Sequence, residues 1–460
     1  MSPLTRRRPR RWPWLVAAAA LAALAYFIAP AFEWRAPRIE LSPDGPYLGG
    51  AGLVLQVREE GRGLRRLEVV LVRGGERVVL ARRDYDRPVS EDRLEIQAAD
   101  WRGRLEEGPA RLVVIAVDRS LWGWGRGNRA RLERPLTVDF TPPQVSPVHV
   151  PYYVNLGGSG LVIYRASDAQ ASELRLAGHV FPAVGGWQGD PHTFAAVFTH
   201  PVDAPATARP VIVARDAAGN IARLEVGYRL KPRRYRRRDI RISDGFIRRK
   251  VLPLLGGRGT GEDPVRAFLA VNRDLRAANG ETLRRLTSRG SPRKLWEGAF
   301  LQLPNSKVEA RFADRRRYLY RGREIHRAMH MGFDLASVRR VPVPAANHGI
   351  VVFAGALGIY GNAVVLDHGL GVYSLYAHLS SWSVRPGQRV ARGETLGRSG
   401  ETGLAGGDHL HFGVYVWGVP VLPVEWWDPH WMRDAVEGPL ADLRTLGQAV
   451  AAQQPPGGSD

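Results

Sequence analysis

The histidines of this 460-residue chain are concentrated in its C-terminal third, where eight of the twelve lie after residue 320. Three stretches carry most of them: His330-Met331-Gly332-Phe333-Asp334, Tyr376-Ala377-His378-Leu379 and His409-Leu410-His411. A catalytic zinc site needs three nitrogen or oxygen ligands and one open position. Because side chains alternate across a strand, His409 and His411 are expected to project from one face. The pattern therefore predicts a fold that brings the three stretches together around one metal.

These stretches belong to a longer ordered set of motifs. The others are Gly358-Ile359-Tyr360-Gly361-Asn362, Asp367-His368-Gly369, Val384-Arg385-Pro386-Gly387, Gly400-Glu401-Thr402-Gly403 and Phe412, which follows His411. With this set, residues 295–430 resemble the lysostaphin-type, or LytM-type, zinc metallopeptidases of family M23, which cut peptide bonds in bacterial peptidoglycan. The resemblance implies a mainly antiparallel β peptidase domain over 295–430.

The resemblance also implies a set of site residues. One zinc ion per chain would be held by His330, Asp334 and His411. His378 and His409 would be the catalytic histidines, which orient or deprotonate a zinc-activated water and return a proton to the leaving amine. Which of the two histidines does which stays open.

Other residues near these motifs have weaker assignments. His326 stands four residues before His330 and could form a different metal pair, but only His330 has Gly and Asp at the offsets of the family pattern. Contacts to substrate are predicted for Tyr360 and Asn362. The histidines expected to be structural or exposed are His348, His368 and His430.

Three functions are compatible with such a site. The first is a zinc metalloendopeptidase that hydrolyses the peptide cross-links of peptidoglycan, with stem peptides as substrate. The second is a catalytically silent LytM-type regulator of another cell-wall hydrolase, against which the retention of all five site residues argues. The third is an envelope zinc protease that acts on proteins.

The N-terminus has the pattern of a membrane anchor. Residues 1–11 contain five arginines and no acid, and residues 12–32 form an uncharged run that is long enough to cross a bilayer. The positive-inside rule predicts a cytoplasmic basic tail over 1–11 and a single-pass helix over 12–32 in the inner (cytoplasmic) membrane. The catalytic region would then lie in the periplasm or extracytoplasmic space. A cleaved signal peptide, ending near Ala29-Pro30-Ala31, is the alternative.

Two all-β units are expected between the anchor and the peptidase domain. Alternating apolar residues and Gly- and Pro-rich breaks predict a β-sandwich over 38–141 and a second one over 142–231. The heptapeptide at 127–133 recurs at 219–225 with one difference, Arg129 against Ile221, and the offset of 92 residues suits immunoglobulin-like sandwiches. Both units are expected to be spacers or docking surfaces.

The remaining segments flank the peptidase domain. Residues 232–294 read as a basic, helical connector that packs on it, with Asp263 as an N-cap and Asn279-Gly280 as the end of its helix. Residues 431–460 are expected to hold a C-terminal helix and a disordered tail.

The chain has a net charge of +21 and no cysteine. The absence of cysteine excludes a thiol nucleophile. Because no nucleic-acid motif is present, the charge favours anionic envelope polymers as further partners, and no binding of nucleic acid is expected.

Overall fold

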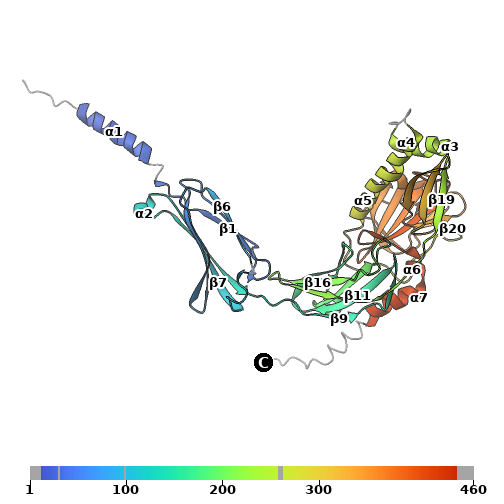
Figure 1. Cartoon of the computed structure of the whole chain (residues 1–460), viewed down its shortest axis with the longest axis horizontal. Coiled ribbons are helices and arrows are strands. Elements are labelled where there is room, and N and C mark those ends of the chain that lie inside the picture. The colour runs from blue at the N-terminus through green and yellow to red at the C-terminus, as the bar shows by residue number, and fades with distance from the viewer. Residues whose placement is uncertain (1–11, 29–31, 98–99, 257–262, 443–460) are drawn as a thin grey trace, which may run out of the picture. The chain divides into compact units, whose positions relative to one another are not determined.

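The computed structural model describes residues 12–28, 32–97, 100–256 and 263–442 (Figure 1). These ranges are mainly β, as predicted, and they divide into two compact units. The first unit comprises residues 1–142 and 216–221, and the second comprises 143–215 and 222–460.

The N-terminal helix α1 spans Trp12–Ile28 and has 17 residues. Among the residues that the structure describes, no helix is both long and apolar enough to cross a membrane. The predicted transmembrane segment over 12–32 is therefore not supported. Residues 29–31 and the predicted tail over 1–11 lie outside the described residues.

Two sheets form the β part of the first unit, with strand orders β1-β3-β6 and β2-β8-β7-β4-β5. Alternate residues of β3 are buried, as its period-two pattern predicts. The elements are β1 (Arg38–Ser42), β2 (Tyr47–Leu48), β3 (Leu53–Arg58), β4 (Leu64–Arg73), β5 (Glu76–Asp84), β6 (Glu91–Ile96), β7 (Gly108–Asp118), α2 (Trp122–Gly125) and β8 (Arg129–Val138).

The range 142–231 is also all-β, with sheet orders β14-β15-β11-β9 and β13-β12-β16-β17 and a parallel pair of β10 and β18. The immunoglobulin-like relationship and the boundaries of both ranges stay predictions. The elements are β9 (Val145–His149), β10 (Tyr153–Asn155), β11 (Ser159–Ala166), β12 (Ala169–Leu176), β13 (His179–Pro182), β14 (Val184–Gly185), η3 (Trp187–Gly189), β15 (Thr193–Thr199), β16 (Val211–Asp216), β17 (Ile221–Glu225) and β18 (Arg229–Lys231).

The sequence repeat is also a structural repeat. In its first copy Asn128 donates from its backbone N–H and its side-chain amide to the two carboxylate oxygens of Asp118, at 2.7 and 2.8 Å. In the second copy Asn220 makes the same pair of bonds to Asp216, at 2.8 and 3.0 Å. The repeated Asn therefore makes the same pair of bonds twice, although the bonded residues are ten positions apart in the first copy and four in the second.

The connector is more than a helix. The end of its arginine-rich start lies in β19 (Arg237–Ile242), which pairs in parallel with β21 in the sheet β19-β21-β22. Asp263 caps the helix as predicted, but the helix continues through Gly280 to Leu286. The segments after β19 are α3 (Asp244–Phe246), η4 (Ile247–Val251), η5 (Leu252–Leu255), α4 (Pro264–Leu269), η6 (Ala270–Leu275) and α5 (Arg276–Leu286).

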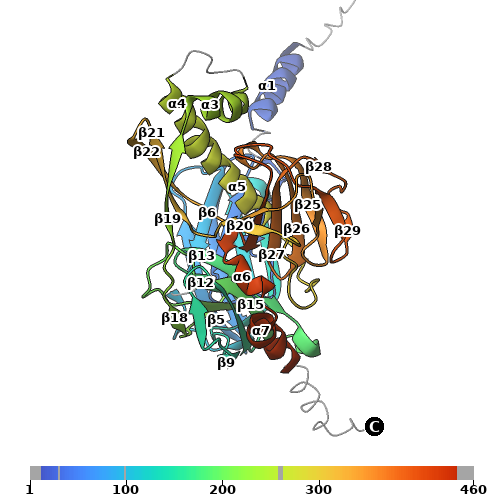
Figure 2. The same ribbon diagram turned by 90° about the vertical axis from the view of Figure 1, so that its right-hand side faces the viewer.

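Figure 2 shows α5 beside the strands that follow the connector. Phe268 packs with Tyr318 and Ile359 in one buried cluster, and the Ile359 N–H donates to the Asn279 side chain at 2.8 Å. The predicted packing of the connector on the catalytic region is thus present. The buried Asn279 explains why Asn279-Gly280 does not end the helix, because this pair is part of the docking face.

The catalytic region is built on a sheet of order β20-β23-β31-β27-β26-β25-β29, with β32 paired to β31 and a small sheet β24-β30-β28 beside it. The elements are β20 (Lys307–Ala310), β21 (Arg315–Tyr320), β22 (Arg323–Met329), β23 (Phe333–Ala336), β24 (Pro342–Pro344), β25 (Gly349–Ala356), η7 (Gly358–Tyr360), β26 (Asn362–Gly369), β27 (Val372–Leu379), β28 (Ser381–Trp382), β29 (Arg389–Val390), β30 (Thr395–Arg398), β31 (Leu410–Val416), β32 (Val419–Val421), α6 (Pro423–Trp427), α7 (Pro429–Met432) and η8 (Arg433–Glu437).

The second β range and the catalytic region share one core. Leu161, Phe198, Trp296 and Trp426 belong to the same cluster of buried apolar residues. The C-terminal helix starts at Pro429, slightly before the predicted segment 431–460, and is described to residue 442. The predicted disordered tail lies outside the described residues.

Candidate metal centre and active site

Two neighbouring strands carry the predicted metal ligands. In the antiparallel pair of β23 and β31, Asp334 lies directly opposite His411. Side chains directly opposite in such a pair stand on the same face of the sheet and close together. His330 precedes β23 by three residues in a short loop, so its ring can turn back over the same face.

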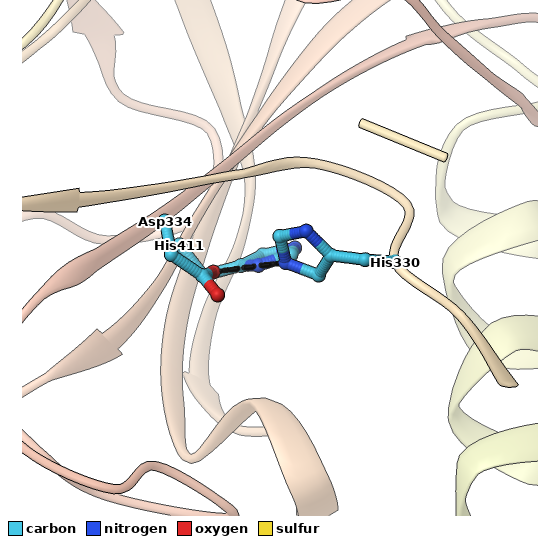
Figure 3. A group of neighbouring side chains, drawn as sticks. All are labelled: His330, Asp334 and His411. Atoms are coloured by element: carbon cyan, nitrogen blue, oxygen red, sulfur yellow. Dashed lines mark hydrogen bonds and ion pairs between the residues drawn. The ribbon is translucent and has the colours of Figure 1, made fainter. Parts of the chain in front are cut away.

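The three side chains converge on a single point, as Figure 3 shows. Nε2 of His330 is 2.9 Å from Oδ1 of Asp334 and 3.0 Å from Nδ1 of His411. Nδ1 of His411 is 2.9 Å from the same Asp334 oxygen. The structure therefore brings His330, Asp334 and His411 into one triad with three inward-facing donor atoms.

The donor set suits zinc. The Nδ1–H of His330 donates to the Arg311 carbonyl at 3.0 Å, which leaves the lone pair of Nε2 directed into the triad. Two imidazole nitrogens and one carboxylate oxygen are common zinc ligands. Ligands of one tetrahedral zinc, each about 2.0–2.2 Å from the ion, stand roughly 3.3 Å apart, which is close to the observed spacing.

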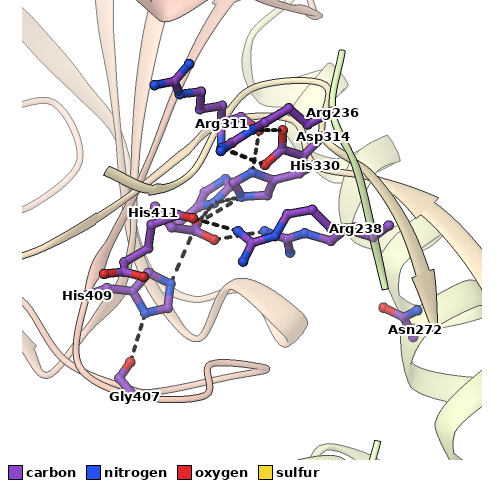
Figure 4. A network of polar contacts seen from close by, with 12 residues as sticks. Arg236, Arg238, Asn272, Arg311, Asp314, His330, Gly407, His409 and His411 are labelled. Atoms are coloured by element: carbon purple, nitrogen blue, oxygen red, sulfur yellow. Dashed lines mark hydrogen bonds and ion pairs between the residues drawn. The ribbon is translucent and has the colours of Figure 1, made fainter. Parts of the chain in front are cut away.

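A second layer of contacts holds the His330 loop (Figure 4). The buried carboxylate of Asp314 accepts the Arg311 N–H at 3.0 Å and pairs with the Arg236 guanidinium at 3.3 Å. The Asp314 carbonyl also accepts the His330 N–H at 3.1 Å. This network fixes the Arg311 carbonyl, which selects the tautomer of His330. Nothing in the local sequence motif indicates the network.

Arg316 holds the other oxygen of the aspartate. Its NH2 group donates to Oδ2 of Asp334 at 2.9 Å, and both side chains are largely buried, with 18% and 14% of their surface exposed. Asp334 therefore presents only Oδ1 to the triad. No sequence motif indicates this role of Arg316.

Replacing Arg316 with Met is expected to weaken metal binding about 10- to 100-fold, because the ligand carboxylate loses the partner that orients it. Competition with a chelator measures the affinity. Arg327→Met is the matched control, since Arg327 pairs with Glu324 and has 76% of its side chain exposed. Unchanged affinity in Arg316→Met would show that Arg316 is not needed to orient Asp334.

The two predicted catalytic histidines lie beside the triad. Nδ1 of His378 bonds the Thr402 carbonyl and Nδ1 of His409 bonds the Gly407 carbonyl, both at 2.8 Å. Each ring therefore keeps Nε2 for other partners. The two ring centroids are 4.8 Å apart, and Nε2 of His409 is 3.6 Å from Oδ1 of Asp334. His409 and His411 thus do face the same side, as the His-x-His alternation predicts.

Two features of His378 cost free energy in the folded protein. Its backbone has φ of 61° although it stands near the end of β27, a left-handed conformation that costs a non-glycine residue about 1–3 kcal/mol. Burial lowers the pKa of its imidazole well below the usual value, and the neighbouring His409 acts in the same direction. The His378 imidazole is therefore neutral and is held on a strained backbone.

One glycine of the motif is required by contact. A Cβ atom on Gly332 would lie 2.5 Å from the Phe412 carbonyl oxygen and 2.7 Å from Nε2 of His411. The loop between His330 and Asp334 can therefore pass closely over β31 only without a side chain at this position.

A groove of about 670 Å³ opens over the triad and is lined by His378 and His409 as well. Tyr360, predicted to contact substrate, lines it with its ring 5.5 Å from that of His411. Asn362, the other predicted contact, is not among the described residues that line it. His326 lines the groove further out, where it stacks on Tyr318, and is not part of the triad.

The other histidines have no place in the triad. His368 is fully buried and bonds the His348 carbonyl and the Ser374 hydroxyl, both at 2.7 Å. Burial lowers its pKa to about 4. His430 has 78% of its side chain exposed and His348 has 41%. These positions agree with the structural or exposed roles expected for them.

Comparison with known proteins identifies the family of this region. Residues 328–423 match the sequence model of peptidase family M23. The chain therefore contains an M23 peptidase domain, as its motifs predict.

Over 96 residues the chain is 45% identical to the DD-carboxypeptidase/endopeptidase Mpg of Neisseria meningitidis, which covers 21% of this chain and 22% of Mpg. Over 196 residues it is 31% identical to the peptidoglycan DD-endopeptidase ShyA of Vibrio cholerae, which covers 40% and 43%. The catalytic domain of lysostaphin from Staphylococcus simulans matches with 29% identity and a TM-score of 0.24, over 28% of this chain and 98% of that domain. The chain thus spans less than half the length of Mpg and ShyA.

Proposed function

We propose that the M23 peptidase domain makes this chain a zinc metalloendopeptidase that hydrolyses the peptide cross-links of bacterial peptidoglycan. The observation that supports this most is the triad of His330, Asp334 and His411, with His378 and His409 at its side in one groove. The similarity to Mpg, a DD-carboxypeptidase/endopeptidase, supports the peptidase activity, and the similarity to ShyA, a peptidoglycan DD-endopeptidase, supports the substrate class.

The roles of the chain's own residues follow from their contacts. His330, Asp334 and His411 would hold the zinc ion. When bound, zinc supplies a Lewis acid for the scissile carbonyl and a water of near-neutral pKa. His378 and His409, each anchored through Nδ1 to a backbone carbonyl, hold Nε2 ready to accept a proton from the water and return one to the leaving amine.

The proposed substrate determines where in the cell the protein would act. Peptidoglycan lies outside the cytoplasmic membrane, so the catalytic region would work in the periplasm or extracytoplasmic space. Attachment to the inner membrane through residues 12–32 stays a prediction, which fractionation of cells that express the full chain and an N-terminally truncated chain would test.

The test is digestion of purified sacculi followed by analysis of the muropeptides. Three samples are compared: zinc-loaded protein, chelator-treated protein and zinc-loaded His409→Ala. Loss of cross-linked dimers with the zinc-loaded wild type alone is expected, and the products identify the bond that is cut.

Two other outcomes would reject the proposal. If no sample cuts the wall but the protein still binds it, the regulator function is favoured. If the wall stays intact while envelope proteins are cut in a zinc-dependent way, the protein is an envelope protease.

A further inference from the structure

The lining of the groove over the triad is strongly basic. The groove is lined by six arginines and by two carboxylates, Glu309 and Asp334; the arginines are Arg238, Arg241, Arg273, Arg276, Arg316 and Arg327. Three of these arginines have carboxylate partners, since Arg273 pairs with Asp274, Arg316 with Asp334 and Arg327 with Glu324.

The other three, Arg238, Arg241 and Arg276, make no ion pair with any residue that the structure describes. All three come from the connector rather than from the residues that match family M23. The connector therefore brings uncompensated positive charge to the groove, which an anionic ligand would neutralise.

Arg276 is held by a buried side chain. Its Nε and one NH2 nitrogen donate to the Asn272 side-chain oxygen at 3.1 and 2.6 Å. Asn272 has no exposed surface, so it gives the guanidinium a fixed support. The other guanidinium nitrogen has no partner among the described residues. A planar guanidinium held in this way is suited to bind a carboxylate.

Arg276 also lies near the triad. It lines the same groove as Tyr360, whose ring centroid is 5.5 Å from that of His411. Arg238 donates to the Glu309 carbonyl at 2.7 Å, and Figure 4 shows it beside His330 and His411, with Asn272 on a neighbouring segment. Ile240 and Phe268 contribute apolar side chains to the lining of the same groove.

We propose that Arg276, supported by Asn272, and Arg238 form a binding site for a free carboxylate of the peptide substrate. This inference rests on the proposed function and narrows its substrate class to cross-linked peptides with an unmodified carboxylate close to the scissile bond. A peptide in which that carboxylate is amidated would leave the two arginines without their partner and be a poor substrate.

The experiment compares two synthetic cross-linked peptides that differ only in a free carboxylate or a carboxamide next to the scissile bond. For the zinc-loaded full chain we expect kcat/KM to be about 10-fold higher for the free carboxylate, mainly through a lower KM. Arg276→Gln and Arg238→Gln should each bring the ratio of the two kcat/KM values close to 1. The ratio does not depend on the fraction of folded enzyme, so a folding defect cannot imitate this result.

Arg285→Gln is the matched control, because Arg285 is an exposed arginine of α5 that does not line the groove. It should keep the wild-type ratio. A wild-type ratio near 1, or a ratio that survives both groove substitutions, would overturn the proposal.

Binding of both peptides to zinc-loaded His409→Ala provides a readout that needs no turnover. Suppose that the wild type cleaves neither peptide, but that His409→Ala binds the free-carboxylate peptide more tightly than the carboxamide peptide. If adding Arg276→Gln to His409→Ala removes this difference in affinity, the carboxylate site stands and the proposed activity fails. If both peptides bind equally, the carboxylate site fails whatever the activity.

Discussion

His409→Ala is expected to lower kcat/KM on a cross-linked peptide by about 10²- to 10⁴-fold while the protein keeps its metal. His411→Ala, two residues further on, is expected to lose both activity and metal. The reason is their different places at the site, since Nδ1 of His411 stands within 3.0 Å of the other two donor atoms, whereas Nε2 of His409 is 3.6 Å from Asp334. Metal content after dialysis and steady-state kinetics on the same samples make the comparison.

The control is His430→Ala, because this ring is 78% exposed and lies outside the groove. Its activity and metal content should equal those of the wild type. Loss of metal from His409→Ala would make His409 a ligand. Full activity of His409→Ala would remove it from the proton transfer steps and leave His378 as the only candidate of the pair.

The site could be predicted where local sequence fixes local geometry. Alternation along a strand places His409 and His411 on one face, and the Gly in the His-x-Gly-x-Asp loop permits the close approach to His411. The support of the ligands could not be predicted in this way. The Arg316 contact to Asp334 and the Asp314 contact to Arg311 depend on how separate strands and loops meet, and no spacing in the sequence encodes that.

The fold shows the same limit. Alternating patterns correctly predict β structure over residues 38–231. The segment 232–294 is predicted to be a basic, helical connector, but the end of its arginine-rich run lies in β19, which pairs with β21. In isolation a run of arginines favours a solvated segment, and its strand form depends on a partner strand more than 70 residues away, as Arg237 pairs with Arg315. The same limit applies to Asn279-Gly280, which is predicted to end the helix. The helix continues because the tertiary contacts of Asn279 outweigh the local preference of this pair for a helix end.

A buried carboxylate joins the second β range to the catalytic region. Glu425, in α6, has 4% of its surface exposed. Its two oxygens accept the side-chain amide of Asn155 and the backbone N–H of Ser159, both at 2.7 Å. Burial raises the pKa of Glu425 to about 7, and the two hydrogen bonds only partly offset the effect.

The raised pKa predicts how stability depends on pH. A folded-state pKa above the unfolded value of 4.5 means that the folded state binds the proton more tightly. The contribution of Glu425 to the free energy of unfolding is therefore fully present below pH 4.5 and is lost as the pH rises through about 7. Above that pH, an ionised and buried Glu425 costs about 3 kcal/mol relative to its protonated form.

Glu425→Gln should remove this cost, since glutamine has the same shape and no charge. Its oxygen can accept the Ser159 N–H, and a flip of the Asn155 amide can satisfy its NH2 group. We expect the free energy of unfolding of the variant and the wild type to agree near pH 4.5, and the variant to be more stable by up to about 3 kcal/mol at pH 8. Calorimetry of the full chain at both pH values measures the difference, with Glu297→Gln, whose side chain is 83% exposed, as the control. A difference between variant and wild type that is the same at both pH values would show that Glu425 does not take up a proton on folding.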